Sequence, residues 1–136
     1  MSIYVGGYQI HHIGYLVKNI DKSKSVFLAL GYQVEQDMIY DEYRGVDICF
    51  MVNNGYRIEL VSPKGHSSAV SELRKKMGNT PYHICYEVED LNTAIKDLSK
   101  QHFVIWQEPH SAPAIDGKRV AFLVNGKIGI VELVEI

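Results

Sequence analysis

Hydrophobic and polar residues alternate over residues 9–17, which is the pattern of a β-strand with one buried face. Further strand-like runs follow at 32–40, 46–53 and 56–61. The last two are joined by Asn53-Asn54-Gly55, which is typical of a β-hairpin turn. The first four runs therefore predict four strands.

A helix is expected between the first two of these strands. Asn19 or Asp21 can cap its start, and Gly31 can end it after Leu30. Val26, Phe27 and Leu30 are expected on one apolar face of this helix. The first part of the chain therefore has the predicted order βαβββ.

The second half repeats this order after a short helix that Ser67 or Ser68 can cap. Its expected elements are a strand at 82–88, a helix at about 90–100, and strands near 103–107, 119–124 and 129–134. A looser loop containing Pro109, Pro113 and Gly117 is expected before Arg119.

The two halves also resemble each other residue by residue. His12-Ile13-Gly14-Tyr15-Leu16-Val17 matches His83-Ile84-Cys85-Tyr86-Glu87-Val88 at an offset of 71 residues. Residues 57–61 match residues 130–134 at an offset of 73. A period near 70 residues is too long for the common solenoid repeats of about 20–50 residues. We therefore predict one domain over residues 1–136, built from fused modules at about 9–63 and 81–136.

Four polar residues fall at equivalent places in the two modules. Strand alternation puts His12 and His83 on the face opposite the aromatic and aliphatic rows, and it sets Glu59 and Glu132 against their apolar neighbours. If the modules are related by pseudo-twofold symmetry, the four side chains converge inside a curved sheet. Two imidazoles and two carboxylates suit zinc or a first-row transition ion. We therefore predict a site for one divalent metal ion.

Composition narrows the class of protein. The chain has 136 residues, 46% of them hydrophobic and 22% charged, and a formal net charge of −2, which is unlike a nucleic-acid-binding protein. No apolar run approaches the roughly 20 residues of a membrane span. Cys49 and Cys85 lie in apolar runs and do not indicate a disulfide framework. A cytoplasmic protein without a nucleic-acid or membrane partner is expected.

The sequence resembles the vicinal oxygen chelate superfamily, and within it the branch of glyoxalase I and methylmalonyl-CoA epimerase. Four stretches carry the resemblance: His11–Val17, Tyr56–Pro63, Tyr82–Val88 and Gly129–Leu133. The resemblance implies an α+β fold in which two βαβββ modules form a curved mixed sheet around a metal-binding cavity. It also implies that the ligands are His12, Glu59, His83 and Glu132. His11 has the opposite strand parity and is interpreted as a non-ligand.

The resemblance implies an enzyme with a small-molecule substrate, a nickel, cobalt or zinc ion, and a homodimeric assembly. Its proton-transfer role falls on Glu132, with Glu59 as the symmetry mate. An epimerase-type second glutamate is missing at the position aligned with Tyr43, and Glu42 is one residue away. This favours a glyoxalase I-type lyase that isomerises a hemithioacetal to a 2-hydroxyacyl thioester. An acyl-CoA epimerase and a non-catalytic binding protein of the resistance type are the alternatives.

Other residues have weaker expectations. Tyr43, Arg44 and Trp106 could line a substrate entrance, although Trp106 fits the core equally well. Arg57 and Arg119 could bind an anionic group of a thiol carrier, with ion pairs to acidic side chains as the simpler use. Cys85 shares the face of His83 and is expected to be a small buried thiol. Solvent exposure is expected for His66, His102 and His110.

Overall fold

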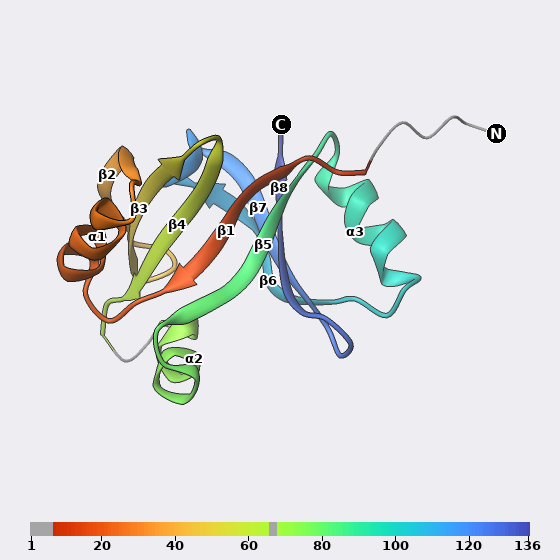
Figure 1. Cartoon of the computed structure of the whole chain (residues 1–136). Helices are drawn as coiled ribbons and strands as arrows, with labels where there is room; N and C mark the ends of the chain where they lie inside the picture. Colours follow the sequence, from red (N-terminus) through yellow and green to blue (C-terminus); the bar gives the residue numbers. More distant parts are fainter. Residues whose placement is uncertain (1–6, 66–67) are drawn as a thin grey trace.

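The computed structural model of the chain describes residues 7–65 and 68–136. Residues 1–6, His66 and Ser67 lie outside the described part, so the expectations for His66, for a Ser67 cap and for the start of the domain are not addressed. Within the described ranges the chain forms eight strands, three α-helices and one 3₁₀-helix (Figure 1). These elements are β1 Ile10–Leu16, α1 Ile20–Ala29, β2 Gln33–Asp41, β3 Val46–Asn53, β4 Tyr56–Pro63, α2 Ala69–Met77, β5 Thr80–Val88, α3 Leu91–Ser99, β6 Val104–Ala112, η1 Pro113–Ile115, β7 Lys118–Asn125 and β8 Gly129–Glu135.

All strands belong to one mixed sheet with the order β2-β3-β4-β1-β5-β8-β7-β6. Each half has the same internal order, and the halves meet where β1 pairs antiparallel with β5. The first strand of each half pairs in parallel with the last, β1 with β4 and β5 with β8. The predicted fold class, two βαβββ modules in a curved mixed sheet, is confirmed (Figure 1).

Two helices begin at predicted caps, and the third begins next to residue 90, the position predicted for its start. The Asn19 side chain accepts a hydrogen bond from the Lys22 amide at 2.8 Å, and Asp90 accepts one from the Thr93 amide at 2.8 Å. Ser68 caps α2. The expected apolar face of α1 is wrong in part, because Val26 and Leu30 are 63% and 64% exposed. Leu30 follows the last helical residue, and Val26 is rotated by about 100° from Phe27, which packs inward.

Three apolar clusters stabilise the sheet. One lies between α1 and the first half and includes Ile20 and Leu60, and another lies between α3 and the second half and includes Leu91 and Leu133. The third joins both halves and includes Val46, Val61 and Val120, among others. This third cluster borders the polar site described below.

The loop expected before Arg119 is more ordered than predicted. Strand β6 continues to Ala112, which pairs with Lys118 of β7, and Pro113–Ile115 form η1. Ala114 and Ile115 are buried in the third cluster, so this segment closes part of the inner face of the sheet. Among the described residues, we find no helix that is long and apolar enough to cross a membrane.

Candidate metal centre

Strand register brings the four predicted polar residues to one place. In the first half Gly14 of β1 pairs with Glu59 of β4, two residues after His12. In the second half Cys85 of β5 pairs with Glu132 of β8, two residues after His83. Each glutamate thus lies diagonally across from the histidine of its own module, and the β1–β5 pairing places the two histidines together. The residues that are equivalent in the two sequence repeats therefore also occupy equivalent positions in the structure.

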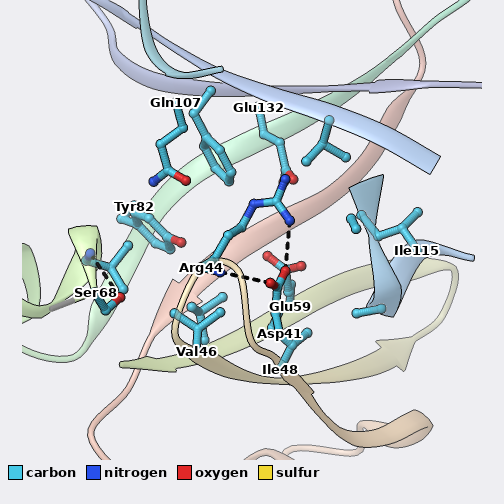
Figure 2. A pocket seen from close by; sticks show the side chains of 16 residues that line it. Asp41, Arg44, Val46, Ile48, Glu59, Ser68, Tyr82, Gln107, Ile115 and Glu132 are labelled. Carbon is cyan, nitrogen blue, oxygen red and sulfur yellow. Dashed lines mark hydrogen bonds and ion pairs between the residues drawn. The ribbon is translucent and has the colours of Figure 1, made fainter. Parts of the chain in front are cut away.

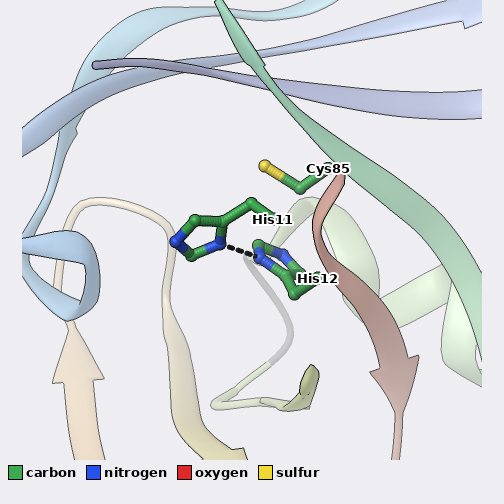
Figure 3. Close-up of side chains that lie close together, drawn as sticks. All are labelled: His11, His12 and Cys85. Carbon is green, nitrogen blue, oxygen red and sulfur yellow. Dashed lines mark hydrogen bonds between the residues drawn. The ribbon is translucent and has the colours of Figure 1, made fainter. Parts of the chain in front are cut away.

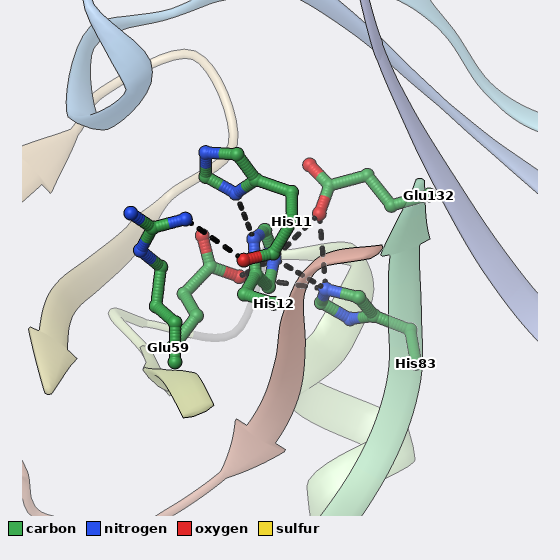
Figure 4. Close-up of polar contacts among 6 residues, drawn as sticks. His11, His12, Glu59, His83 and Glu132 are labelled. Atoms are coloured by element: carbon green, nitrogen blue, oxygen red, sulfur yellow. Dashed lines mark hydrogen bonds and ion pairs between the residues drawn. The ribbon is translucent and has the colours of Figure 1, made fainter. Parts of the chain in front are cut away.

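The four side chains form a buried cluster, which we call the quartet: His12, Glu59, His83 and Glu132. None of the four residues is more than 4% exposed. The Nε2 atoms of His12 and His83 lie 3.1 Å apart, and they lie 2.9 and 3.0 Å from Glu132 Oε1 (Figure 4). Glu59 Oε1 is 3.3 Å from His12 Nε2 and 3.5 Å from His83 Nε2.

The side-chain nitrogen and oxygen atoms of the quartet are spaced like the ligands of a metal ion. Within the described part of the chain Glu132 Oε1 makes no hydrogen bond, although both imidazole nitrogens are within 3.0 Å. Metal bonds of about 2.0–2.2 Å place neighbouring ligand atoms about 3.0–3.5 Å apart, which matches the observed spacings. All four donor atoms lie within 4.8 Å of one another. The quartet can therefore hold a zinc or first-row transition ion.

The ionisation of the quartet is strongly perturbed. Burial disfavours the charged form of His12, but the Glu59 and Glu132 carboxylates outweigh burial and raise the pKa of His12 to about 10. Burial likewise tends to lower the pKa of His83, but the facing carboxylates of Glu132 and Glu59 outweigh burial and raise this pKa. Burial tends to raise the pKa of Glu132 and of Glu59, but the facing imidazoles lower both. The facing carboxylates thus favour protons on the imidazoles, and a cation bound between the same groups would take the place of those protons.

Two phenylalanines support the histidines and were not predicted as part of the site. Phe50 of β3 contacts the His12 ring edge-on at 5.2 Å, and Phe122 of β7 contacts the His83 ring edge-on at 5.2 Å. Phe50 pairs with Glu59 and Phe122 with Glu132 across the strands. Their separation of 72 residues lies between the two repeat offsets, so a complete comparison of the modules would have found them.

His11 does not point away from His12 as strand parity predicted. The β1–β5 register shifts between Ile10 and His12, which leaves His11 as the extra residue of a β-bulge. Its Nδ1 lies 2.7 Å from His12 Nδ1 (Figure 3). Burial, followed by the charges of His12 and Arg57, lowers the pKa of His11 to about 4. His11 lies outside the quartet, although it forms a second potential metal-binding group with His12 and Cys85.

Cys85 is a fully buried free thiol, as expected. Burial, reinforced by the carboxylates of Glu132 and Glu59, holds the pKa of the Cys85 thiol well above its usual range. Since the thiolate is the form that binds metals, this environment makes Cys85 a poor ligand.

A pocket opens beside the quartet and encloses about 450 Å³, its open mouth included (Figure 2). Glu59 and Glu132 line it together with the polar side chains of Asp41, Arg44 and Tyr82. Its apolar walls are formed by Val46, Ile48, Val61, Val70, Ala112, Ala114, Ile115, Val120 and Phe122. A mostly apolar pocket with a few convergent polar groups is the usual form of a small-molecule site.

Arg44 is held rigidly at this pocket. Its Nη1 donates to Asp41 Oδ2 at 2.8 Å and to the Ser111 carbonyl at 3.0 Å, and its Nη2 donates to the His110 carbonyl at 3.1 Å. The Arg44 side chain is 9% exposed, and its Nε has no hydrogen-bond partner in residues 7–65 and 68–136. Arg44 therefore joins the β2–β3 turn to the edge strand β6 across the inner face of the sheet.

The remaining candidates lie as follows. Tyr43 is exposed and stacks on the His110 ring at 3.4 Å, and Glu42 is exposed; neither lines the pocket. Trp106 is partly buried against Phe122.

Arg57 and Arg119 form ion pairs with acidic side chains, the simpler of the two roles expected for them. Arg57 pairs with Glu35 at 2.7 Å and Arg119 with Glu135 at 3.6 Å. His102 is exposed as expected, whereas His110 is partly buried.

Comparison with known families identifies the class of protein. The family model of the Glyoxalase/Bleomycin resistance protein/Dioxygenase superfamily matches residues 11–122. The chain belongs to this superfamily, which confirms the resemblance stated from the sequence.

Several relatives of the chain are methylmalonyl-CoA epimerases. The chain is 29% identical over 129 residues to bovine mitochondrial methylmalonyl-CoA epimerase, covering 92% of this chain and 73% of that protein. It is 30% identical over 117 residues to the human mitochondrial enzyme, covering 85% and 65%. A variant of Streptomyces coelicolor methylmalonyl-CoA epimerase, solved with 2-nitronate-propionyl-CoA, has the same fold, with a TM-score of 0.81, 23% identity, and coverage of 96% and 95%.

These relatives overturn the preference for a glyoxalase I-type lyase. That preference depended on the missing glutamate at Tyr43, yet the relatives found are epimerases. A single aligned position was too weak a criterion, because Tyr43 is exposed and does not line the pocket, whereas Arg44, the next residue of the same turn, does. The epimerase alternative is the better supported one.

Proposed function

We propose that the chain is an acyl-CoA epimerase of the methylmalonyl-CoA type. We also propose that His12, Glu59, His83 and Glu132 hold one divalent ion of the nickel, cobalt or zinc class. The observation that carries the proposal is the meeting of two carboxylates, one from each module, at one point of the pocket (Figure 4). The epimerase relatives support the choice of reaction.

Epimerisation at a carbon next to a thioester needs proton transfer on two faces. One group, present as a carboxylate, removes the proton from C2 and leaves an enolate. A second group, present as the carboxylic acid, returns a proton to the opposite face and becomes the carboxylate. Glu132 from β8 and Glu59 from β4 reach the site from different halves of the sheet, so they suit these two roles. In the reverse direction their roles exchange. When bound, the ion supplies Lewis-acid stabilisation of the developing negative charge.

The pocket suits a short acyl group that carries a polar end. Its aliphatic walls can enclose a methyl branch, while Arg44, Tyr82 and Gln107 offer hydrogen-bond donors. Burial, followed by the charges of Glu59 and Glu132, raises the pKa of Tyr82 well above its usual range. Tyr82 therefore stays a neutral hydroxyl that can donate to a substrate oxygen.

The test is solvent deuterium exchange. Each separate epimer of methylmalonyl-CoA is incubated with the metal-loaded protein in D₂O, and NMR follows deuterium at C2 together with the ratio of epimers. We expect both epimers to exchange and interconvert, and we expect His12→Ala and His83→Ala to lose the metal and the exchange together. Binding of the thioester without exchange would instead favour the non-catalytic binding protein.

Three further features stay predictions: one domain over residues 1–136 with modules at about 9–63 and 81–136, a homodimeric assembly, and a cytoplasmic location.

A further inference from the structure

His11 and His12 are adjacent in the chain, and their side chains meet ring to ring. The β-bulge in β1 turns the His11 ring toward His12, where the two Nδ1 atoms lie 2.7 Å apart. The Nε2 of His12 faces the other way, toward Glu132 and His83 (Figures 3 and 4). One nitrogen of His12 thus belongs to the quartet and the other to His11.

The direction of this hydrogen bond decides whether His12 can bind a metal. A neutral imidazole has one donor and one acceptor nitrogen. If His12 Nδ1 carries the proton, it donates to His11 and leaves the Nε2 lone pair free for the quartet. If His11 is the donor, the proton of His12 sits on Nε2, between Glu132 and His83, and blocks coordination.

We propose that His11 is a positioning residue: its Nδ1 accepts a hydrogen bond from His12 Nδ1–H and thereby fixes the tautomer that presents His12 Nε2 to the metal ion. This inference rests on the metal site of the proposed function and assigns a role to a residue outside the quartet. Partners of ligand histidines that fix the tautomer and orient the ring contribute measurably to metal affinity.

The surroundings of His11 hold it in position for this role. Its backbone carbonyl accepts a hydrogen bond from Arg57 Nη1 at 2.9 Å, and Glu35 binds the same guanidinium at 2.7 and 3.2 Å. The Phe50 ring contacts the His11 ring edge-on at 6.0 Å. Strands β3 and β4 therefore fix the bulge.

His83 provides a contrast within the same site. Its Nδ1 is buried and has no hydrogen-bond partner among the described residues, so no contact at this outer nitrogen selects its tautomer. Of the two histidines in the quartet, His12 is the one whose outer nitrogen has a partner.

The test combines NMR with metal affinity. In protein with ¹⁵N-labelled histidine, we expect a scalar coupling between the two Nδ1 atoms across the hydrogen bond, with the proton covalently attached to His12. The decisive spectrum is that of the Zn²⁺-loaded protein, in which His12 is a neutral imidazole. Zinc affinity is measured by chelator competition in wild type, in His11→Phe, which lacks an acceptor, and in His11→Asn, whose Oδ1 lies near the position of Nδ1.

We expect His11→Phe to weaken zinc binding by about 10–100-fold, and His11→Asn to restore most of it. His102→Asn removes an exposed histidine at φ 68°, a conformation that asparagine tolerates, and should leave affinity unchanged. Thermal melting of each metal-free variant separates loss of the acceptor from loss of the fold.

Three results would overturn the role of His11. The first is equal zinc affinity in His11→Phe and wild type, and the second is a proton attached to His11 Nδ1. The third is a second equivalent of Co²⁺ with a sulfur-to-cobalt charge-transfer band, which would show that His11, His12 and Cys85 bind an ion of their own. If wild-type protein binds no zinc, the proposed metal site fails, whereas zinc binding that His11→Phe leaves unchanged removes the role of His11 alone.

Discussion

Gly14 of β1 faces His83 of β5 across the centre of the sheet, and the His83 ring fills the space where a side chain on residue 14 would be. A Cβ added to Gly14 would lie 2.0 Å from His83 Cε1 and 2.3 Å from His83 Nδ1. The matching residue of the second module is Cys85, which pairs with Glu132 as Gly14 pairs with Glu59. The interior of the metal site thus depends on the small size of residue 14.

We therefore expect Gly14→Ala to displace the His83 ring from the quartet. The new methyl group overlaps a buried ring, and overpacking of this kind costs about 1–3 kcal/mol in the free energy of unfolding. The loss in the free energy of zinc binding should exceed the loss in the free energy of unfolding, because the displaced His83 cannot keep its Nε2 beside Glu132. Chelator competition and urea denaturation of the metal-free protein measure the two effects.

Gly126→Ala is the matched control for Gly14→Ala. A Cβ at residue 126 meets no atom of the described residues within 4 Å, so both measurements should remain at wild-type values. Wild-type zinc affinity in Gly14→Ala would show that His83 is free to move without loss of function, against the geometry described here.

A second prediction separates the two glutamates by the epimer on which each acts. Glu132→Gln and Glu59→Gln keep the side-chain shape and remove its basicity. Loss of a general base typically lowers the rate by about 10²–10⁴-fold. In each variant we expect epimerisation to stop, while deuterium still enters the one epimer whose C2 proton faces the remaining glutamate.

The preserved epimer should therefore differ between the two glutamine variants. Exchange is followed by NMR in D₂O on each pure epimer, with metal content measured on the same samples. If Glu59→Gln exchanged and interconverted both epimers at the wild-type rate, Glu59 would not be a proton-transfer group.

A third prediction concerns the buried ion pair of Asp41 and Arg44. Asp41 is 1% exposed and binds Arg44 through both the guanidinium and the backbone amide. Removing one partner of a buried pair leaves an uncompensated charge and typically costs about 3–5 kcal/mol. We expect Asp41→Asn and Arg44→Met each to lower the free energy of unfolding by about this amount, and the double variant to cost less than the sum.

Glu72 and Lys75 form an exposed ion pair, which serves as the control for the variants of Asp41 and Arg44. Their pair spans 3.4 Å on the surface of α2, with side chains 72% and 53% exposed. Glu72→Gln and Lys75→Met should each change stability by less than about 1 kcal/mol in the same urea titrations. Strict additivity for Asp41 and Arg44 would contradict a coupled buried pair.

The quartet could be predicted from the sequence because it depends on repetition and alternation. His12 and His83, and Glu59 and Glu132, occupy equivalent places in two similar modules, and strand parity gave their common face. The position of His11 could not be predicted in this way. A β-bulge changes parity at one residue, and nothing in the alternation of residues 9–17 marks where the extra residue lies.

The pocket could not be predicted from sequence patterns either, because its walls come from segments far apart in the chain. Arg44 reaches the carbonyls of His110 and Ser111, and Ala114 comes from a 3₁₀-helix in what was expected to be a loose loop. Such contacts depend on how far the sheet curls, which local periodicity does not specify.

The last prediction tests whether this pocket holds the acyl group. Ala114 lies in η1, is buried, and lines the pocket without belonging to the quartet. Ala114→Leu should fill part of the pocket and raise KM for methylmalonyl-CoA by about 10-fold, since steric differences of one or a few methylene groups are worth about 1–3 kcal/mol. Zinc affinity should stay at the wild-type value, because the added atoms lie on the wall. Ala29→Leu adds the same atoms to an exposed position of α1 and serves as the control. An unchanged KM in Ala114→Leu would place the acyl group elsewhere, whereas a parallel loss of zinc binding would show that the wall and the quartet are not independent.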